Sequence, residues 1–372
     1  MKTNWQTKNF EDCLDKVVYT SKIQRKDFLK SGLFPIISQE SEDINGYWDD
    51  KKDLFKCKKP VVIFGDHTQV LKYVDFDFVL GADGVKILQP KEILDSRFFY
   101  FFLQSVDLKS LGYARHYRLL KEIDVSFPSL PEQHRIVKIL DEVFEDTAKA
   151  KENAEKNLQN AKELFESYLQ SVFANPGKDW EKKRLGDVYD VRDGTHDSPK
   201  YQKVGYALIT SKNLKRDELD YQKIKYISEK DYDKINERSK VHKGDILFAM
   251  IGTIGSPVVI KTEPDFAIKN VALFKIPKEQ NSYFLKYFLD SKFVIDKIMS
   301  EAKGTTQKFV GLGYLRDFKI QLPKLDEQKS IVAKLDALSA ETKKLEAIYK
   351  QKLADLDELK KSVLKRAFNG EL

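Results

Sequence analysis

The stretch LPEQHRIVKILDE at residues 130–142 returns as LDEQKSIVAKLDA at residues 325–337, which is 195 residues later (325 − 130). The same offset still pairs Leu169 with Leu364, so the two copies align without a gap over roughly forty residues. Loops readily gain or lose residues between copies of a repeat, whereas a continuous helix does not. The repeat therefore predicts two long helices, the second close to the end of the chain.

Apolar residues recur along both copies in alternating steps of four and three. This spacing is a heptad pattern, in which a narrow apolar stripe of one helix packs against a partner helix. A helix from Pro131 to Phe173 would be about 65 Å long at ~1.5 Å per residue, which is long for a globular protein. The residues that we expect in the seam or at a subunit-docking surface are Ile136, Leu140, Val143, Leu164, Ile331, Leu335, Leu338 and Leu359.

The two helices have two possible arrangements. As separate amphipathic helices, each would lie on its own core. The narrow apolar stripe and the many Lys and Glu residues on the other faces favour a pair instead. In that pair the first helix carries the chain from the first globular region to the second, and the second helix starts there and runs back. The pair is therefore expected to be antiparallel.

The segments that precede the two helices are also related. NWQTKNFEDCL at residues 4–14 resembles DWEKKRLGDVY at residues 179–189. In both regions short β-branched runs broken by Gly and Asp are followed by an aromatic-rich helix pattern, which begins near Ser96 and near Asn281. We expect an α+β protein with an internal pseudo-two-fold repeat. Its two globular mixed α/β domains, separated by two long antiparallel coiled-coil helices, would be residues 1–129 and 176–323, and its helices 130–175 and 324–372.

Composition and charge restrict the class of protein. The chain has 372 residues, is 41% hydrophobic and has a formal net charge of +7, so a clustered excess of Lys and Arg would favour a polyanionic partner. Cys13 and Cys57 show no metal-ligand spacing, which favours a reduced protein. The N-terminus lacks the apolar segment of a signal peptide, and the longest apolar run, ILFAMI at residues 246–251, is too short to span a bilayer. We therefore expect a cytoplasmic protein with no membrane segment.

Several motifs together resemble the specificity subunit of Type I restriction-modification systems. They are FPSLPEQHRIV, LPKLDEQKSIV, the terminal RAFNGEL, DGTHDSPKY at residues 193–201, and the pair FGDHT and FVLGADGVKIL in the first region. The resemblance covers essentially the whole chain. It implies two target recognition domains that each read one half of a bipartite site in double-stranded DNA. It also implies that the helix pair sets the spacer and docks two methyltransferase subunits, through which restriction subunits join, and that the chain itself has no catalytic role and no cofactor.

Reading DNA requires hydrogen-bond donors on loops that a rigid frame holds in place. Polar loops stand just before both long helices, as GYARHYR at residues 112–118 and KGTTQKF at residues 303–309, and polar turns occur earlier in both regions. Arg and Lys pair with guanine, and Gln pairs with adenine. The residues that we expect to contact DNA are His67, Thr68, Arg115, His116, Tyr117, Arg118, Thr195, His196, Lys200, Tyr201, Thr253, Lys303, Thr305, Thr306, Gln307 and Lys308.

Two other classes of function were considered. A metal-dependent nuclease is suggested by Pro264-Asp265 followed by Glu301, Ala302 and Lys303, but Glu301 ends an amphipathic helix pattern instead of lying on a strand beside Asp265. The second alternative is a coiled-coil spacer that binds only proteins, which would not need a basic polar loop at the same place in both regions. No phosphate-binding Gly-Lys loop, methylase motif or His-Cys metal spacing occurs in the sequence.

Overall fold

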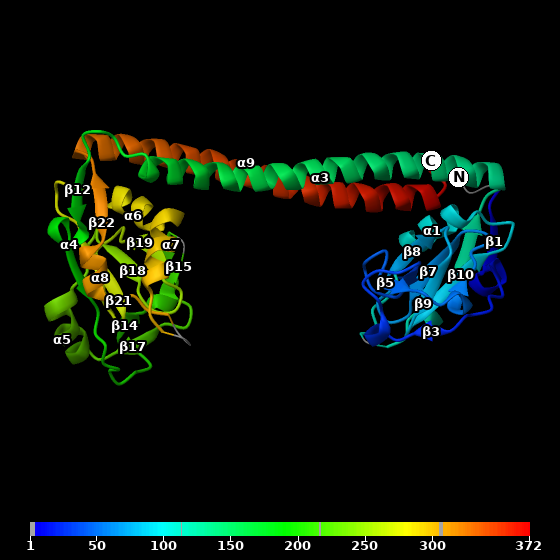
Figure 1. Ribbon diagram of the computed structural model, residues 1–372, viewed down its shortest axis with the longest axis horizontal. Helices are drawn as coiled ribbons and strands as arrows, with labels where there is room; N and C mark the ends of the chain where they lie inside the picture. Colours follow the sequence, from blue (N-terminus) through cyan, green and yellow to red (C-terminus); the bar gives the residue numbers. More distant parts are fainter. Residues whose placement is uncertain (1–3, 113, 216, 305–307) are drawn as a thin grey trace. The chain divides into compact units, whose positions relative to one another are not determined.

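The computed structural model describes residues 4–112, 114–215, 217–304 and 308–372 (Figure 1). The chain forms two compact units. The first unit contains residues 1–155 and 350–372, and the second contains residues 156–349. Each unit combines a globular α/β part with one stretch of each long helix (Figure 1).

Short strands build the globular part of the first unit. They are β1 (Gln6–Asn9), β2 (Leu14–Asp15), β3 (Lys22–Ile23), β4 (Phe34–Ile37), β5 (Gly46–Trp48), β6 (Leu54–Phe55), β7 (Val61–Gly65), β8 (Leu71–Val74), β9 (Phe78–Gly81), β10 (Val85–Pro90) and β11 (Asp124–Phe127). One antiparallel sheet has the order β2-β10-β7-β8. The other has the order β3-β9-β4-β5, in which β9 runs parallel to β3 and β4 and also pairs with β6. Strand β1 pairs with β11, which leads into the first long helix.

The second unit is built in the same way. Its strands are β12 (Glu181–Arg184), β13 (Asp190–Asp193), β14 (Tyr206–Ile209), β15 (Leu214–Lys215), β16 (Glu218–Leu219), β17 (Lys225–Ile227), β18 (Ile246–Ala249), β19 (Gly255–Val259), β20 (Phe266–Ile268), β21 (Val271–Lys275) and β22 (Lys319–Leu322). The sheet β13-β21-β18-β19 corresponds to β2-β10-β7-β8, and the parallel pair β14/β20 corresponds to β4/β9. The pair β12/β22 corresponds to β1/β11. The internal repeat expected from the sequence is confirmed.

Shorter helices complete both units. The first unit has α1 (Ser96–Ser105) and α2 (Tyr117–Leu120). The second has α4 (Leu185–Val188), α5 (Glu229–Ser239), α6 (Ser282–Asp290), α7 (Lys292–Glu301) and α8 (Leu312–Asp317). Helices α1 and α6 are the aromatic helices of the repeat. Asp95 caps α1 by accepting hydrogen bonds from the backbone of Arg97 and Phe98, and Asn281 caps α6 in the same way.

The long helices are α3 (Leu130–Ala174) and α9 (Leu325–Phe368). In the first unit, Leu140 near the start of α3 shares a core with Phe368 at the end of α9. In the second unit, Phe173 near the end of α3 shares a core with Leu335 near the start of α9. The start of each helix therefore packs beside the end of the other, which confirms the expected antiparallel pair.

The eight residues expected in the seam or at a docking surface differ in burial. Ile136, Leu140 and Leu335 are buried, and Val143, Ile331 and Leu338 are half-buried. Leu164 and Leu359, in contrast, are 51% and 46% exposed.

The exposure of Leu164 and Leu359 has a physical cause, because each long helix packs against an aromatic helix as well as against its partner. Toward the end of α3 the buried face moves to Phe165, Leu169 and Phe173, and the ring of Phe173 lies 5.5 Å from that of Phe284 on α6. At the end of α9, Phe368 lies 5.1 Å from Phe98 on α1. This extra contact turns the buried stripe away from a strict heptad.

Candidate DNA-recognition surface

In the first unit the structure brings together two loops that are far apart in sequence. The turn after β7 contains His67 and Thr68, and the second loop leads into α2. The backbone N–H of His116 donates to the carbonyl of Asp66 at 2.7 Å, and the N–H of Tyr117 donates to the Asp66 carboxylate at 2.7 Å. Asp66 is buried, so the fold itself holds the two loops in contact.

The expected DNA contacts in the first unit do not all have the same surroundings. Arg115 and Arg118 are exposed. His116 is only 1% exposed, its Nε2 accepts from the N–H of Leu111, and its Nδ1 lies 3.0 Å from the carbonyl of Asp66. The His116 side chain therefore belongs to the interior and cannot reach DNA. The Thr68 hydroxyl donates to the backbone of Gln39, and the half-buried ring of Tyr117 packs near Phe10 and Phe64.

The same edge of the first unit carries basic residues that the sequence analysis missed. Lys22 approaches the first strand position of β10, since its Nζ lies 3.4 Å from the carbonyl of Val85. Desolvation by the surrounding residues lowers the pKa of Lys22, and the like charges of Lys86 and Arg115 lower it further. No sequence pattern links these three residues, because Lys22 lies on β3, Lys86 on β10 and Arg115 in the loop before α2. The charges of Asp83 and Asp66 act in the opposite direction on Lys22, and Lys86 lies 3.9 Å from the Asp66 carboxylate, so this group of residues carries both signs of charge.

The second unit brings the corresponding two loops together. The turn after β18 contains Thr253, and the other loop contains Lys303 and Lys308. The N–H of Gly252 donates to the carbonyl of Lys308 at 2.9 Å, and Lys303 forms two main-chain hydrogen bonds with Phe309, at 2.9 and 2.8 Å. Thr253, Lys303 and Lys308 are exposed. Thr305, Thr306 and Gln307 lie outside the described residues.

A third loop of the second unit starts at the same sheet edge. Asp193 at the end of β13 pairs with Ala272, and Ala249 at the end of β18 pairs with Val271, so the loops that follow Asp193 and Ala249 leave the sheet side by side. In the first of these loops, His196 bonds through one ring nitrogen to the Asp193 carboxylate and through the other to Asn270, both at 2.8 Å.

The rest of this loop carries further polar groups. Thr195 is half-buried and Lys200 is exposed. The ring of Tyr201 is 42% exposed, and the Lys225 ammonium lies 4.1 Å from its centroid. An exposed aromatic ring beside a cation suits stacking and phosphate contact. The loop therefore extends the polar edge of the second unit.

The glutamine of the repeated phrase, Gln133 in the first copy and Gln328 in the second, has a structural role. Gln133 is fully buried, accepts from the N–H of Asp95 at 2.8 Å and donates to the carbonyls of Ile93 and Pro128. The bonds to Asp95 and Ile93 tie the start of α3 to the segment that caps α1, and the bond to Pro128 holds the turn that leads into α3. The sequence displayed the repeat of this residue, but not its role.

Gln328 occupies the equivalent position in the second unit, since 328 − 133 = 195. It is also fully buried, accepts from the N–H of Asn281 at 2.9 Å, and donates to the carbonyl of Pro323 and the side chain of Gln280. The two glutamines therefore act as matching clamps between a long helix and the cap of an aromatic helix.

A second polar contact between a long helix and an aromatic helix differs between the two units. Asp141 on α3 binds Arg97 of α1 through two guanidinium nitrogens at 2.8 and 3.0 Å. Its counterpart on α9, Asp336 (336 − 141 = 195), accepts instead from the hydroxyl of Tyr287 on α6 at 2.5 Å. Burial, followed by this carboxylate, raises the pKa of Tyr287. The same helix position thus meets a cation in one unit and a phenol in the other.

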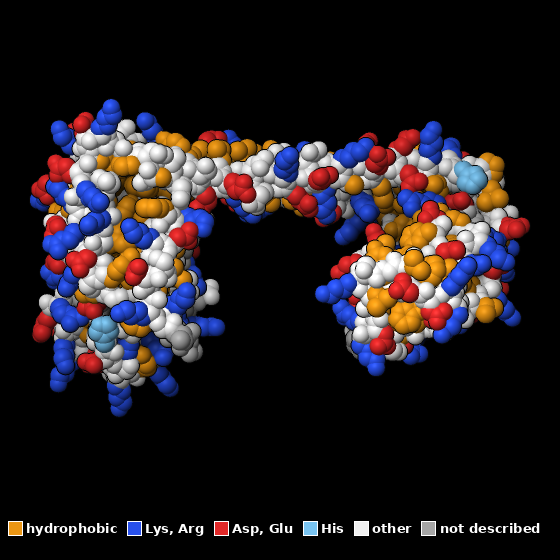
Figure 2. Space-filling view, viewed as in Figure 1, with side chains coloured by type: hydrophobic (Ala, Val, Ile, Leu, Met, Phe, Trp, Pro, Cys, Tyr) orange, Lys and Arg blue, Asp and Glu red, His pale blue; other side chains and the backbone are white. Residues whose placement is uncertain are grey.

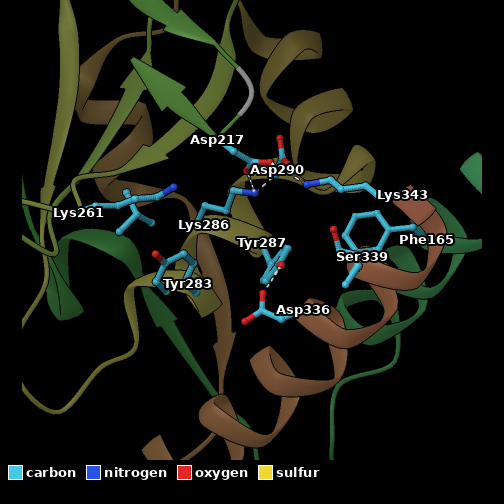
Figure 3. Close-up of a pocket in the computed structure, with 12 residues that line it drawn as sticks. Phe165, Asp217, Lys261, Tyr283, Lys286, Tyr287, Asp290, Asp336, Ser339 and Lys343 are labelled. Carbon is cyan, nitrogen blue, oxygen red and sulfur yellow. Dashed lines mark hydrogen bonds and ion pairs between the residues drawn. The ribbon is translucent and has the colours of Figure 1, made fainter. Parts of the chain in front are cut away.

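The Tyr287 joint borders a cavity of about 360 Å³ in the second unit (Figure 3). Lys286 is buried there, and its ammonium lies 2.5 Å from Asp217 and 3.5 Å from Asp290. Lys343 of α9 lies 3.7 Å from the same Asp217 (Figure 3). Because these lysines and aspartates neutralise each other, the cavity is better suited to fastening the globular part to its helix than to holding a charged ligand.

The described residues were also compared with the alternatives of a metal site, a nuclease site and a membrane helix. Among the described residues, no cluster of three or more His, Cys, Asp or Glu side chains is arranged to hold a metal ion. Glu301 ends α7, whereas Asp265 precedes β20. No helix in the described part of the chain is long and apolar enough to cross a membrane.

The chain thus contains an α/β domain with a polar loop edge, followed by a long helix, twice over. The chain belongs to the Type I restriction modification DNA specificity domain family, whose sequence profile matches residues 2–159 and 177–354. It is the DNA specificity subunit of a type I restriction-modification system, and it is itself non-catalytic.

Similar proteins agree in sequence and in fold. The type I restriction enzyme EcoBI specificity subunit of Escherichia coli is 24% identical over 390 residues, which covers 94% of this chain and 79% of that protein. The HsdS subunit from Thermoanaerobacter tengcongensis has a TM-score of 0.64 at 17% identity, covering 100% of this chain and 98% of that one. A chain from a study of complex assembly and conformational transition of the type I R-M system has a TM-score of 0.73 at 17% identity, covering 100% and 99%. At 17% identity, the two structural matches show that this chain shares their fold.

Proposed function

We propose that each globular domain reads one half of a bipartite site in double-stranded DNA through its polar sheet edge. The observation that carries this proposal is the repeat of the edge itself. The fold joins the turn after β7 to the loop before α2 in the first unit, and the turn after β18 to the loop before α8 in the second. A rigid sheet below such loops keeps their side chains at fixed positions relative to a groove. Exposed Arg and Lys on the edge suit guanine and phosphate.

Replacing Lys303 and Lys308 with alanine should relax the half-site read by the second domain and leave the other half unchanged. The main-chain bonds of this loop do not depend on the two side chains, so the fold should persist. Each lost bidentate base contact typically removes about 1–3 kcal/mol of discrimination. Sequencing of methylated sites in cells that carry the partner subunits measures the outcome.

The matched control replaces Arg115 and Arg118 of the first domain with alanine. This variant should relax only the other half-site. If either variant altered both halves together, two independent reading domains would be ruled out.

We further propose that two methyltransferase subunits dock on the helix pair and that restriction subunits join through them. Leu164 and Leu359 support two equivalent docking surfaces, because they are related by the repeat (359 − 164 = 195) and are exposed to a similar extent. An apolar side chain that the fold leaves in solvent at the same place twice is suited to the same partner twice. A cytoplasmic location follows from this role and stays a prediction.

Leu164→Glu and Leu359→Glu should each remove one methyltransferase subunit from the complex, and the double variant should remove both. A buried carboxylate without a partner is costly at an apolar interface. Native mass measurement of the reconstituted complex gives the stoichiometry. Ile348→Glu is the control, since Ile348 is 50% exposed but its repeat partner is the polar Asn153 (348 − 195). A complex that kept two methyltransferase subunits in the double variant would contradict the proposal.

A further inference from the structure

The loop that follows β4 meets the polar edge of the first unit through Gln39. The Thr68 hydroxyl donates to the backbone carbonyl of Gln39 at 2.6 Å, and the N–H of His67 donates to the Oε1 of its side chain at 3.2 Å. In the same turn, the N–H of Asp66 donates to the carbonyl of Gly84 at 2.7 Å. Gln39 therefore lies where the turn after β7 and the turn before β10 come together.

Two glycines leave room for the Gln39 side chain. They are Gly65 and Gly84, which belong to the stretches FGDHT and FVLGADGVKIL. A Cβ at Gly65 would lie 2.9 Å from the Cβ of Gln39, and a Cβ at Gly84 would lie 2.5 Å from its Oε1. Gly84 also has a φ of +79°, which favours glycine. Side chains at these two positions would displace the Gln39 amide, so both turns are shaped around it.

A buried lysine holds the loop after β4 in place. Lys72 on β8 is 5% exposed, and its ammonium donates to the side-chain oxygen of Asn45 at 2.9 Å and to the carbonyl of Glu42. The same Asn45 oxygen accepts from the N–H of Ser38 at 2.7 Å. Because Ser38 immediately precedes Gln39, these bonds fix the backbone from which the Gln39 side chain extends.

The bond from His67 also fixes the direction in which the Gln39 amide faces. An N–H donates only to an acceptor, so the amide atom opposite His67 is the oxygen and the NH₂ group lies on the other branch. Within the described part of the chain, Nε2 of this half-buried residue has no hydrogen-bond partner and is not enclosed. Gln39 therefore offers a donor from Nε2 and the second lone pair of Oε1 in a fixed orientation.

We propose that Gln39 is a base-reading residue and that its amide recognises adenine in the half-site of the first domain, called here the first half-site. In the major groove, adenine presents the N7 acceptor beside the N6 amino donor, a pattern that a glutamine amide pairs with through both of its polar atoms. An amide that is already oriented loses little freedom on binding. The inference rests on the proposed function, because it names a reader within the loop edge of the first domain.

The surroundings of Gln39 carry both signs of charge. Figure 2 shows acidic and basic side chains interspersed over the visible face of the first unit, which is built from the strands labelled β3 to β10 in Figure 1. Glu40 follows Gln39 in sequence, and its carboxylate lies 3.0 Å from the guanidinium of Arg25. Base recognition by an amide depends on the geometry of two hydrogen bonds and needs no net positive charge on the loop, whereas phosphate binding does.

The second unit keeps the frame of the loop and changes this residue. The pairing of β4 with β9 and of β14 with β20 places Ser211 where the first unit has Gln39. The Ser211 hydroxyl donates to the carbonyl of Asn270 at 3.1 Å. Residues that only support the fold recur in both units, as Gln133 and Gln328 do. A residue that distinguishes one half-site from the other is expected to differ, as it does here.

The test uses the full chain reconstituted with its methyltransferase subunits, after methylated-site sequencing has given the site of the unaltered complex. Gln39→Glu keeps the acceptor for His67 and loses the Nε2 donor. A carboxylate accepts from the N4 of cytosine but cannot donate to the N7 of adenine. Discrimination against C·G at one A·T base pair of the first half-site should therefore fall roughly 10- to 100-fold. Competition between duplexes that differ only at that base pair measures the change, and the other half-site should remain the same.

A second variant and a control accompany this measurement. Gln39→Leu removes both polar atoms of the amide and should make the same base pair degenerate without a new preference, so the inference stays testable if a carboxylate disturbs the loop. The matched control is Glu40→Gln, which alters the neighbouring side chain and should leave every base preference unchanged. A first half-site that stays the same in both Gln39 variants would overturn the inference. An equal loss of affinity for all sequences would overturn it too, because that result indicates a phosphate contact or a structural role.

Failure of the proposed function has a different signature. If Arg115→Ala with Arg118→Ala relaxes the first half-site while both Gln39 variants leave it unchanged, only the role of Gln39 is wrong. If none of these variants alters the first half-site, the loop edge of the first domain does not read DNA, and the proposed function fails with the inference.

Discussion

Inserting seven residues into both long helices, after Ala154 and after Tyr349, is expected to lengthen the unspecified spacer of the recognised DNA by about three base pairs. The two positions correspond through the repeat, since 349 − 154 = 195. Seven residues make nearly two helical turns, so the packed faces stay in phase. They add about 10 Å at ~1.5 Å per residue, and duplex DNA rises ~3.4 Å per base pair.

The two half-site sequences should remain the same in this variant, because the loops that read them are unchanged. Affinity should fall, since three base pairs also rotate one half-site around the duplex axis by nearly a third of a turn. Methylated-site sequencing of the variant is the deciding measurement. An active variant with the original spacer would show that the helices do not set the distance.

A control separates helix length from helix phase. Inserting four residues into α3 alone should move the residues that follow out of register with α9. The cores that contain Phe165, Leu169 and Phe173 would then lose contacts, and the protein should be destabilised instead of acquiring a new spacer. If this variant were as stable as the double insertion, the packing of the two helices would not depend on phase.

Gln328→Leu is expected to destabilise the second unit by about 3 kcal/mol. The substitution leaves the N–H of Asn281 and the carbonyl of Pro323 without their partner. An unsatisfied buried polar group costs about 1–3 kcal/mol. Leucine cannot replace these bonds, although it has a similar size. The loss should be larger than for a surface substitution because Gln328 is fully buried.

Urea unfolding, followed by the fluorescence of Trp180 in a background in which Trp5 and Trp48 are Phe, measures this effect. Trp180 is a local reporter, since its ring lies 5.9 Å from Phe284 of α6 and its Nε1 donates to Glu327. Gln328→Glu retains the acceptor and loses the donors. A midpoint for Gln328→Leu equal to that of the unaltered chain would contradict the clamp. Gln133→Leu should leave the Trp180 transition unchanged, because it acts on the first unit.

The helix repeat was accessible from the sequence because helices impose strict spacing. A fixed offset and steps of four and three predicted α3 and α9 and the buried positions of Ile136 and Leu335, and the chain order of helices and domains predicted that the pair is antiparallel. The same spacing did not show which of its positions the fold leaves exposed, as at Leu164 and Leu359. Periodicity describes how a helix meets one straight partner, and it contains no information about the third helix that also contacts α3 and α9 in each unit.

The candidate DNA edge required the tertiary structure for a related reason. The sequence alone determined that both regions carry polar loops just before a long helix, and that the chain resembles a specificity subunit. It did not determine that His116 is interior, that Lys22 and Lys86 converge on Arg115, or that Gln39 lies against the turn after β7. Packing between segments that are distant in sequence decides these contacts, and strand pairing brings the segments together. Strand pairing joins segments tens of residues apart, and the main-chain hydrogen bonds that create it are available to every residue type and leave no signature in the side chains.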